Sequence, residues 1–571
     1  DSLSHYDRAI KLKPDFAEAW NNKGLIFHNL NRYNEALSRY DRTIQLKPDF
    51  AETWYNKGNT LKDLNRYDDS LSHYDRAIQL KPDFAEAWNN KGNAFYALGR
   101  FDEALVSYER CFELNPNTPF ILGNLIRNQM TICNWTNLNH RLQVLKDKLT
   151  CGSKASPPFT ILGLFDSPKL QKQCADVYAE DKFYFANQLG TIAKKAKRKK
   201  VRIAYFSMDF RNHPVSYLIT ELFELHNRDK FEVYGFSFGI NTQDPVRQRI
   251  EKAFDKFLDV RHLSNLDIVR LSRQNEIDIA IDLGGHTEGS RPEIFSAKVA
   301  PIQINYLGFP GTMGSLHLDY LIADPTLIPE DTKDKYSEKI IYLPNSYQVN
   351  DSKRKISDRK FTRQEFGLTE NGFIFCCFNN NWKILPKMFD RWMRILRSVD
   401  GSVLWLYENN PAVAKNLRKE AINRNVNPDR LVFAKNMPHA EHLARYKFAD
   451  LFLDTFPYGA HTTASEAIWV GTPIITLQGR SFAARVCSSL LTNIDTPELI
   501  TYSEEEYCSL AIELALNPKK LAKIKTKLFK NQKTTTLFDT KLFSKHIEAA
   551  YKAVYERYHA GLPPDHIHVE P

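Results

Sequence analysis

The first 118 residues repeat one pattern of apolar and polar positions every 34 residues. The period is kept by a proline, a tryptophan and a Lys-Gly pair, which stand at Pro14, Pro48, Pro82 and Pro116, at Trp20, Trp54 and Trp88, and at residues 23–24, 57–58 and 91–92. Units of this length supply two antiparallel helices each and bury their open faces by stacking. Residues 1–16 match the second helix of such a unit, so we expect the chain to begin inside a longer array.

From residue 201 onward the pattern changes to short apolar runs separated by helical stretches. The strand-like runs stand at residues 201–206, 231–238, 277–283, 301–306, 372–378, 403–407, 431–434, 449–453 and 474–477. Strands that alternate with helices predict parallel sheets, and polar loops at their strand ends predict a ligand cleft between two Rossmann-like halves. We expect six parts in chain order: repeats over 1–118, a transition segment over 119–200, a first half over 201–345, a linker over 346–368, a second half over 369–531 and a helical tail over 532–571.

The 34-residue period is the signature of tetratricopeptide repeats, which are protein-binding modules. One polar position recurs in register with it, as Asn22, Asn56, Asn90 and Asn124. A side-chain amide offers both a donor and an acceptor, so a ladder of amides can hold an extended peptide by its backbone. The alternative is that repeat duplication copied a neutral surface residue.

Composition favours a soluble protein of several domains. Of the 571 residues, 43% are hydrophobic and 12% aromatic, which suffices for more than one buried core. Much of the net charge of +10 lies at residues 194–200, a run that we interpret as a solvated linker because no other basic stripe indicates nucleic-acid binding. The eight cysteines lack metal-ligand spacing, and no signal peptide or long apolar run is visible, so we expect a cytoplasmic protein without a membrane partner.

The loop at residues 453–466 is the strongest candidate site. A short apolar strand precedes it, and a helix follows. A helix start directs backbone N–H groups and a positive dipole end to one point, which suits a phosphate group. The alternative is that Thr463 and Glu466 form a capping box that only satisfies the helix start. Because a cap does not require the neighbouring His461 and Thr462, we favour a ligand site.

Ordered motifs after the repeats resemble those of a known enzyme family. There is no GxGxxG fingerprint and no P-loop, which disfavours dinucleotide oxidoreductases and P-loop kinases. The motifs are Asn212-His213-Pro214-x-Ser216, Leu307-Gly308-Phe309-Pro310-Gly311-Thr312, residues 379–386, residues 453–463 and the tail at 552–566. With the repeats, they resemble the O-GlcNAc transferases and their SPINDLY relatives over nearly the whole chain. The resemblance implies an α + α/β fold, in which a tetratricopeptide superhelix is joined to a GT-B pair of Rossmann-like domains.

The resemblance also implies how the donor diphosphate is bound. Lys383 matches a lysine that contacts the diphosphate, where a fixed ammonium stabilises the charge that develops on the leaving group. Thr462 and Thr463 match the hydroxyl groups beside the phosphates, and His461 matches the histidine next to them. A surface lysine that only forms a salt bridge is the alternative for Lys383.

The nucleotide side is implied by five further positions. His442 and Arg445 match residues near the base, and Glu466 stands where the transferases have an aspartate that holds the ribose. Asn380 stands in place of a glutamine, and His439 in place of a lysine near the nucleotide. The glutamate is shared with SPINDLY-type proteins, which move fucose from GDP, whereas the sequence at 461–463 resembles the GlcNAc type. Both donors therefore stay open.

His213 matches a histidine on the acceptor side of the cleft. A neutral imidazole can accept the proton of a serine hydroxyl near pH 7, so His213 is a candidate general base. The alternatives are that it only starts the next helix, or that water or phosphate oxygens remove the proton. Asp278 and His286 stand where the transferases carry a histidine and a tyrosine, so the resemblance gives neither of them a role.

We therefore predict a cytoplasmic, inverting, metal-independent protein O-glycosyltransferase that moves GlcNAc from UDP-GlcNAc to Ser or Thr. No cofactor besides the nucleotide sugar is expected, and the repeats are expected to hold protein or peptide acceptors. A GDP-fucose-dependent O-fucosyltransferase and a non-catalytic tetratricopeptide scaffold are the alternatives. The sequence leaves open whether the chain forms a homodimer.

Overall fold

The computed structural model describes residues 2–183, 189–314 and 317–571. The chain divides into two compact units, Asp1–Lys148 with Lys154–Ser156, and Leu149–Ser153 with Pro157–Pro571. Helices build the first unit, whereas the second contains two parallel sheets. In the described part of the chain, no helix combines the length and the apolar character that crossing a membrane requires.

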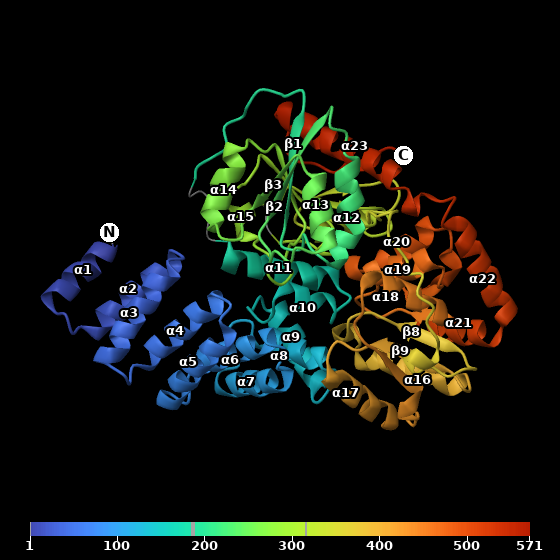
Figure 1. The fold of residues 1–571 in the computed structure, drawn as a ribbon, viewed down its shortest axis with the longest axis horizontal. Helices are drawn as coiled ribbons and strands as arrows, with labels where there is room; N and C mark the ends of the chain where they lie inside the picture. The colour runs from blue at the N-terminus through green and yellow to red at the C-terminus, as the bar shows by residue number, and fades with distance from the viewer. Residues whose placement is uncertain (1, 184–188, 315–316) are drawn as a thin grey trace. The chain divides into compact units, whose positions relative to one another are not determined.

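Helices that pack in antiparallel pairs form the repeat array (Figure 1). In chain order they are α1 (Ser2–Leu12), α2 (Ala17–Asn29), α3 (Tyr33–Leu46), α4 (Ala51–Asp63), α5 (Tyr67–Leu80), α6 (Ala85–Ala97), α7 (Phe101–Leu114), α8 (Ile121–Thr131) and α9 (Leu138–Thr150). The predicted repeats are confirmed. The segment 119–200 contains α8 and α9 and also the short helices α10 (Pro158–Leu162) and α11 (Pro168–Lys182) of the second unit.

A glycine against a tyrosine explains the small and aromatic positions of the repeat. The contact joins the two helices of one repeat in the pairs Gly24–Tyr40, Gly58–Tyr74 and Gly92–Tyr108. A Cβ atom on any of these glycines would lie only 2.6–2.7 Å from a ring carbon, so a larger residue would separate the helices. The constant spacing of 34 residues therefore reflects a packing requirement.

The first sheet of the second unit has eight parallel strands in the order β14-β7-β6-β5-β4-β1-β2-β3. They are β1 (Val201–Ser207), β2 (Phe231–Ser237), β3 (Lys256–Asp259), β4 (Ile279–Asp282), β5 (Ile302–Asn305), β6 (Tyr320–Ala323), β7 (Lys339–Tyr342) and β14 (Ile567–His568). The helices between them are α12 (Pro214–Leu225), α13 (Pro245–Ala253), α14 (Asn265–Gln274) and α15 (Glu293–Ser296). Apolar side chains fill both faces of the central strands, as expected for a parallel sheet between helices.

The second sheet has six parallel strands in the order β10-β9-β8-β11-β12-β13. They are β8 (Ile374–Cys377), β9 (Val403–Tyr407), β10 (Leu431–Ala434), β11 (Leu451–Leu453), β12 (Ile474–Leu477) and β13 (Ile500–Thr501). Its helices are α16 (Pro386–Ser398), α17 (Pro411–Ile422), α18 (His439–Arg445), α19 (Thr462–Val470), α20 (Val486–Asn493), α21 (Glu504–Leu516) and α22 (Pro518–Asn531). Two doubly wound halves after helical repeats confirm the predicted fold class.

The tail of the chain returns to the first half. Helix α23 (Thr540–His559) packs against α12 and β5, and β14 then pairs with β7 at the edge of the first sheet. The hydroxyl groups of Tyr551 on α23 and Tyr205 on β1 lie 3.1 Å apart. The predicted helical tail is therefore structurally part of the first half, although it follows the second half in sequence.

Candidate active site

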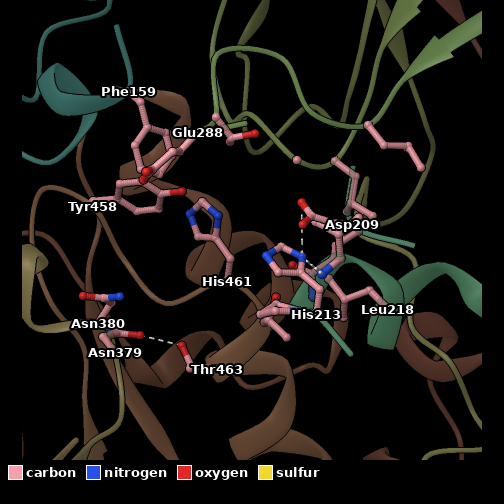
Figure 2. A pocket seen from close by; sticks show the side chains of 18 of the residues that line it. Phe159, Asp209, His213, Leu218, Glu288, Asn379, Asn380, Tyr458, His461 and Thr463 are labelled. Carbon is pink, nitrogen blue, oxygen red and sulfur yellow. Dashed lines mark hydrogen bonds and ion pairs between the residues drawn. The ribbon is translucent and has the colours of Figure 1, made fainter. Parts of the chain in front are cut away.

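A cavity of about 350 Å³ lies between the two α/β halves, at the carboxyl ends of their strands (Figure 2). The first half contributes His213 from the loop between β1 and α12. The second half contributes Lys383 from the loop after β8, and the start of α19 with Thr462 and Thr463. Carboxyl ends of parallel strands are the usual ligand position in such folds. The structure thus brings His213 together with Lys383 and the start of α19 in one cavity.

Asp454 holds the loop between β11 and α19 in place. Its buried carboxylate accepts hydrogen bonds from the Ala460 backbone N–H at 2.6 Å and from the Thr476 hydroxyl at 2.7 Å. It also accepts one from the Asn379 amide at 3.1 Å, which ties this loop to the loop after β8. Burial raises the pKa of Asp454, and the Thr476 and Ala460 donors, together with the charge of Lys383, oppose that shift. One carboxylate therefore sets the backbone path toward the helix start.

Thr463 does not form the capping box that the sequence allowed. Helix α19 has His461 as its N-cap residue and no side-chain cap. The Thr463 hydroxyl donates to the Asn379 side-chain oxygen across the two loops (Figure 2), and Glu466 pairs with two histidines instead. The capping-box alternative is therefore wrong, and no side chain caps the start of α19.

Lys383 is fixed in the wall of the same cavity. Its ammonium donates to the Gly459 carbonyl at 2.9 Å and lies 3.9 Å from the centre of the Tyr458 ring. The ring of Tyr458 in turn contacts Phe159 and His461. A cation held by a carbonyl and an aromatic face needs little reorganisation when an anion arrives.

His461 lies beside this cation as a neutral imidazole. Burial and the positive charge of Lys383 both lower the pKa of His461 well below its ordinary value. Its Nε2 lies 3.1 Å from the Ala483 carbonyl oxygen, which can only accept, so Nε2 carries the proton. The other ring nitrogen is left with a lone pair that can accept a hydrogen bond from a ligand.

His213 and Asp209 form the acceptor side of the cavity. Asp209 is buried, and one of its carboxylate oxygens lies 3.5 Å from Nδ1 of His213 (Figure 2). Burial lowers the pKa of His213, and the Asp209 carboxylate opposes that shift, so the ring is mainly neutral at pH 7. A proton on Nδ1 directed at Asp209 leaves Nε2 as a base. The same Nδ1 also accepts a hydrogen bond from the Val215 N–H at 3.4 Å, so His213 caps the start of α12 as well, and this contact competes with Asp209 for Nδ1.

A second cavity, of about 860 Å³, adjoins the first and shares Pro214 and Thr463 with it. It brings together the predicted nucleotide-side residues His439, His442, Arg445 and Glu466, whereas the remaining one, Asn380, lines the first cavity. Together the two cavities form a continuous candidate site for an elongated donor.

Glu466 is the centre of the second cavity. Its carboxylate accepts from Nε2 of His439 at 2.8 Å and lies 3.3 Å from Nε2 of His442. Burial alone would raise the pKa of Glu466, but the two histidines outweigh burial and hold it far below its usual range. The ring of Tyr217, from the first half, stacks on His439 with centroids 3.9 Å apart. Glu466 is thus held rigidly in the wall of the second cavity.

Arg445 is buried with little freedom to move. It donates to the Lys435 carbonyl at 2.7 Å and lies over the Phe378 ring at 4.5 Å. Burial lowers the pKa of Arg445. It therefore lines the second cavity as a fixed cation.

Asp278 and His286 lie outside both cavities. Asp278 precedes β4, at the opposite end of the strand, in a third cavity with Lys195 and His559. Burial lowers the pKa of His286 to about 4, and its Nε2 lies 2.9 Å from the Met313 carbonyl. Neither residue lines the cavity that contains His213 and Lys383.

The four asparagines predicted to hold acceptor peptides are half-buried on the first helices of successive repeats, at Asn22, Asn56, Asn90 and Asn124. Two of them already donate to the preceding repeat. The Asn56 amide donates to Asn21 at 3.1 Å, and the Asn90 amide donates to Asn59 at 2.8 Å. The ladder thus joins repeats, and peptide binding stays a prediction.

Sequence reasoning assigned no function to three residues that shape the site. Asp454 and Asn379 stood inside recognised motifs, but their role as loop anchors depends on contacts between loops that are 75 residues apart. Phe159 lies in α10, and its ring packs against Trp382 and Tyr458 in the cavity wall. Nothing in the local sequence of the segment 119–200 indicates that position.

Comparisons with known proteins agree with this geometry. A model of glycosyl transferase family 41 matches residues 174–361 and 357–547. Models of tetratricopeptide repeats match residues 5–38, 24–64, 58–99 and 85–118. A solved structure of a lysine-to-methionine mutant of the Thermobaculum terrenum O-GlcNAc transferase is similar, with a TM-score of 0.68 and 25% identity, covering 94% of this chain and 97% of that chain.

Two curated proteins illustrate the similarity in sequence. The probable UDP-N-acetylglucosamine–peptide N-acetylglucosaminyltransferase SEC of Arabidopsis thaliana is 38% identical over 377 residues, which are 65% of this chain and 39% of that protein. The probable UDP-N-acetylglucosamine–peptide N-acetylglucosaminyltransferase SPINDLY of Oryza sativa is 30% identical over 380 residues, which are 65% of this chain and 40% of that protein. The chain therefore spans about two-fifths of the length of these relatives.

Proposed function

The chain belongs to glycosyl transferase family 41, and from this premise we propose that it transfers GlcNAc from UDP-GlcNAc to Ser or Thr hydroxyl groups of proteins. The names of the relatives, which include UDP-GlcNAc–peptide transferases, support this donor and this class of acceptor. The observation that carries the proposal is that the Lys383 ammonium and the start of α19 line one cavity between the two halves.

The proposed reaction is a single displacement. The acceptor hydroxyl forms a bond to C1 of the sugar while the bond between C1 and the diphosphate oxygen breaks, so UDP leaves with the electron pair and the configuration at C1 inverts. The hydroxyl proton goes to Nε2 of His213, in the tautomer whose Nδ1–H is directed at Asp209. Lys383 and the N–H groups at the start of α19 stabilise the negative charge that develops on the diphosphate.

The donor would lie across both cavities, with its diphosphate beside Thr463, which lines both. The ribose hydroxyl groups would donate to Glu466, and the base would lie near Arg445 in the second cavity. Because a lysine and a helix start supply the positive charge, we propose that the reaction proceeds without a metal or another cofactor. Activity is then expected to be unchanged by EDTA.

The repeats would hold the protein acceptor. Replacing Asn56 and Asn90 together with alanine is expected to lower kcat/KM for a protein acceptor while hydrolysis of UDP-GlcNAc stays unchanged. Equal losses in both reactions would contradict a role in acceptor binding.

Transfer of radiolabelled sugar to proteins of a cell lysate tests the proposed function. UDP-GlcNAc is expected to label proteins, with GDP-fucose as the parallel donor and Lys383→Met as the control. Labelling from GDP-fucose alone would replace the proposed donor with the runner-up, which the glutamate at position 466 favours by its resemblance to SPINDLY-type proteins. No labelling from either donor would leave only a binding scaffold.

A further inference from the structure

Gln348 is a buried residue in the wall of the first cavity that neither the motifs nor the mechanism uses. It lies between β7 and the second half, and 1% of its surface is exposed. Its backbone is held firmly, because its own N–H donates to the Ser346 hydroxyl at 3.0 Å and the adjacent Tyr347 N–H donates to Asp324 at 2.9 Å. The position of this side chain is therefore built into the segment that joins the two halves.

The carboxamide of Gln348 lacks partners. Among the described residues, neither its Nε2 nor its Oε1 has a hydrogen-bond partner, and no other described residue that lines this cavity has buried side-chain atoms in that condition. Burying an amide without hydrogen bonds is costly, and proteins rarely retain such groups without a purpose. A ligand that completes the hydrogen bonds would remove that cost when it binds.

Gln303 shows what a satisfied buried glutamine in this protein looks like. It is fully buried in β5, its Oε1 accepts from the Val299 N–H at 2.8 Å, and its Nε2 donates to the Phe295 carbonyl at 3.0 Å. Both glutamines are buried, but only the Gln303 carboxamide forms hydrogen bonds within the fold.

We propose that the Gln348 carboxamide binds a hydroxyl group of the hexosyl residue of the donor, an inference that rests on the proposed function. The amide offers a donor and an acceptor side by side, and a sugar hydroxyl is the ligand group that can satisfy both. A phosphate oxygen could only accept, and the predicted base position lies in the other cavity with Arg445. Gln348 is accordingly a residue that selects for the sugar and not for the nucleotide.

Substitution of Gln348 is expected to affect ligand binding and thermal stability differently, and both can be measured. Removing an unpaired buried amide relieves a cost in the unliganded protein, so Gln348→Leu is expected to leave the thermal unfolding temperature unchanged or to raise it. Gln303→Leu removes a paired amide and leaves its hydrogen-bond partners unpaired, so it is expected to lower the thermal unfolding temperature.

Titration calorimetry with UDP and with UDP-GlcNAc tests the proposal on the full chain. For Gln348→Leu, and for the nearly isosteric Gln348→Met, we expect the affinity for UDP-GlcNAc to fall about tenfold and the affinity for UDP to stay unchanged. Gln303→Leu is the matched control and should change neither affinity at a temperature where it is folded.

Three results would overturn the proposal. Both Gln348 variants could bind UDP-GlcNAc as tightly as the wild type, or they could lose affinity for UDP and UDP-GlcNAc equally, which would indicate a general disturbance of the cavity. If the wild type itself does not bind UDP-GlcNAc, the proposed function fails, and this inference fails with it. The wild-type titration therefore distinguishes the two kinds of failure.

Discussion

Replacing Lys383 with methionine removes one positive charge from the cavity and keeps an unbranched side chain of similar length. The ammonium is held by the Gly459 carbonyl and the Tyr458 ring, so its position is fixed before any donor binds. A fixed charge acts most strongly where charge develops during the reaction. We therefore expect Lys383→Met to lower kcat more than it weakens the binding of UDP.

The size of the effect follows from the charge alone. Two unit charges 4 Å apart attract by about 4 kcal/mol at an effective dielectric constant of about 20. With about half a unit of charge developing on the leaving oxygen, the ammonium lowers the barrier by about 2 kcal/mol, which is about 30-fold in rate. Loss of one preorganised donor in comparable sites costs about 100-fold to 1,000-fold. The expected fall in kcat therefore lies between about 30-fold and 1,000-fold.

Transfer kinetics at saturating UDP-GlcNAc, calorimetry with UDP and thermal unfolding would be measured together on Lys383→Met. Lys387→Met is the matched control, because Lys387 is exposed on α16 four residues further on. The control is expected to retain wild-type kcat. The reasoning is refuted if kcat of Lys383→Met stays within about threefold of the wild type, or if Lys387→Met loses as much.

Three further outcomes are expected. The Asp209 carboxylate raises the pKa of His213, and the neutral imidazole is the active form. Asp209→Asn should therefore shift the acidic limb of the kcat/KM profile to lower pH and reduce kcat by at least about tenfold. An unchanged pH profile would exclude the pairing of Asp209 with His213. Glu466→Gln should raise the Kd for UDP about tenfold in calorimetry, because a charged acceptor for the ribose is lost; equal affinity would place the ribose elsewhere. Gly58→Ala brings a Cβ to 2.7 Å from the Tyr74 ring, so it should destabilise the repeat unit by about 1–3 kcal/mol in thermal unfolding. An unchanged stability would show that the two helices can separate freely.

Local patterns predicted much of this fold because the physical causes are local. The 34-residue period reports the contact between Gly24 and Tyr40 inside one repeat, so spacing alone reveals it. The apolar run before Asp454 and the polar loop after it mark a strand that ends at a ligand site. Parallel topology then places Lys383 and the start of α19 at the same edge of one sheet.

Contacts between distant segments could not be predicted in the same way. Thr463 and Glu466 fit the pattern of a capping box, yet Thr463 pairs with Asn379 in the loop after β8 and Glu466 pairs with His439 at the start of α18. Phe159 reaches the cavity wall from a segment with no motif, and Asp278 lies at the far end of β4 although its neighbours in sequence lead to the site. In each case tertiary packing determines the position of the side chain, and a single sequence does not show which distant segments pack together.

The return of α23 and β14 to the first sheet makes the second half an insertion. The polypeptide crosses between the halves once after β7 and again before α23, so a rotation that opens the cleft has to bend two tethers at the same time. Two connections restrict the rotation of the halves to one axis and oppose their separation. It also means that a chain ending at residue 531 would lose the outermost strand of the first sheet and leave the edge of β7 bare.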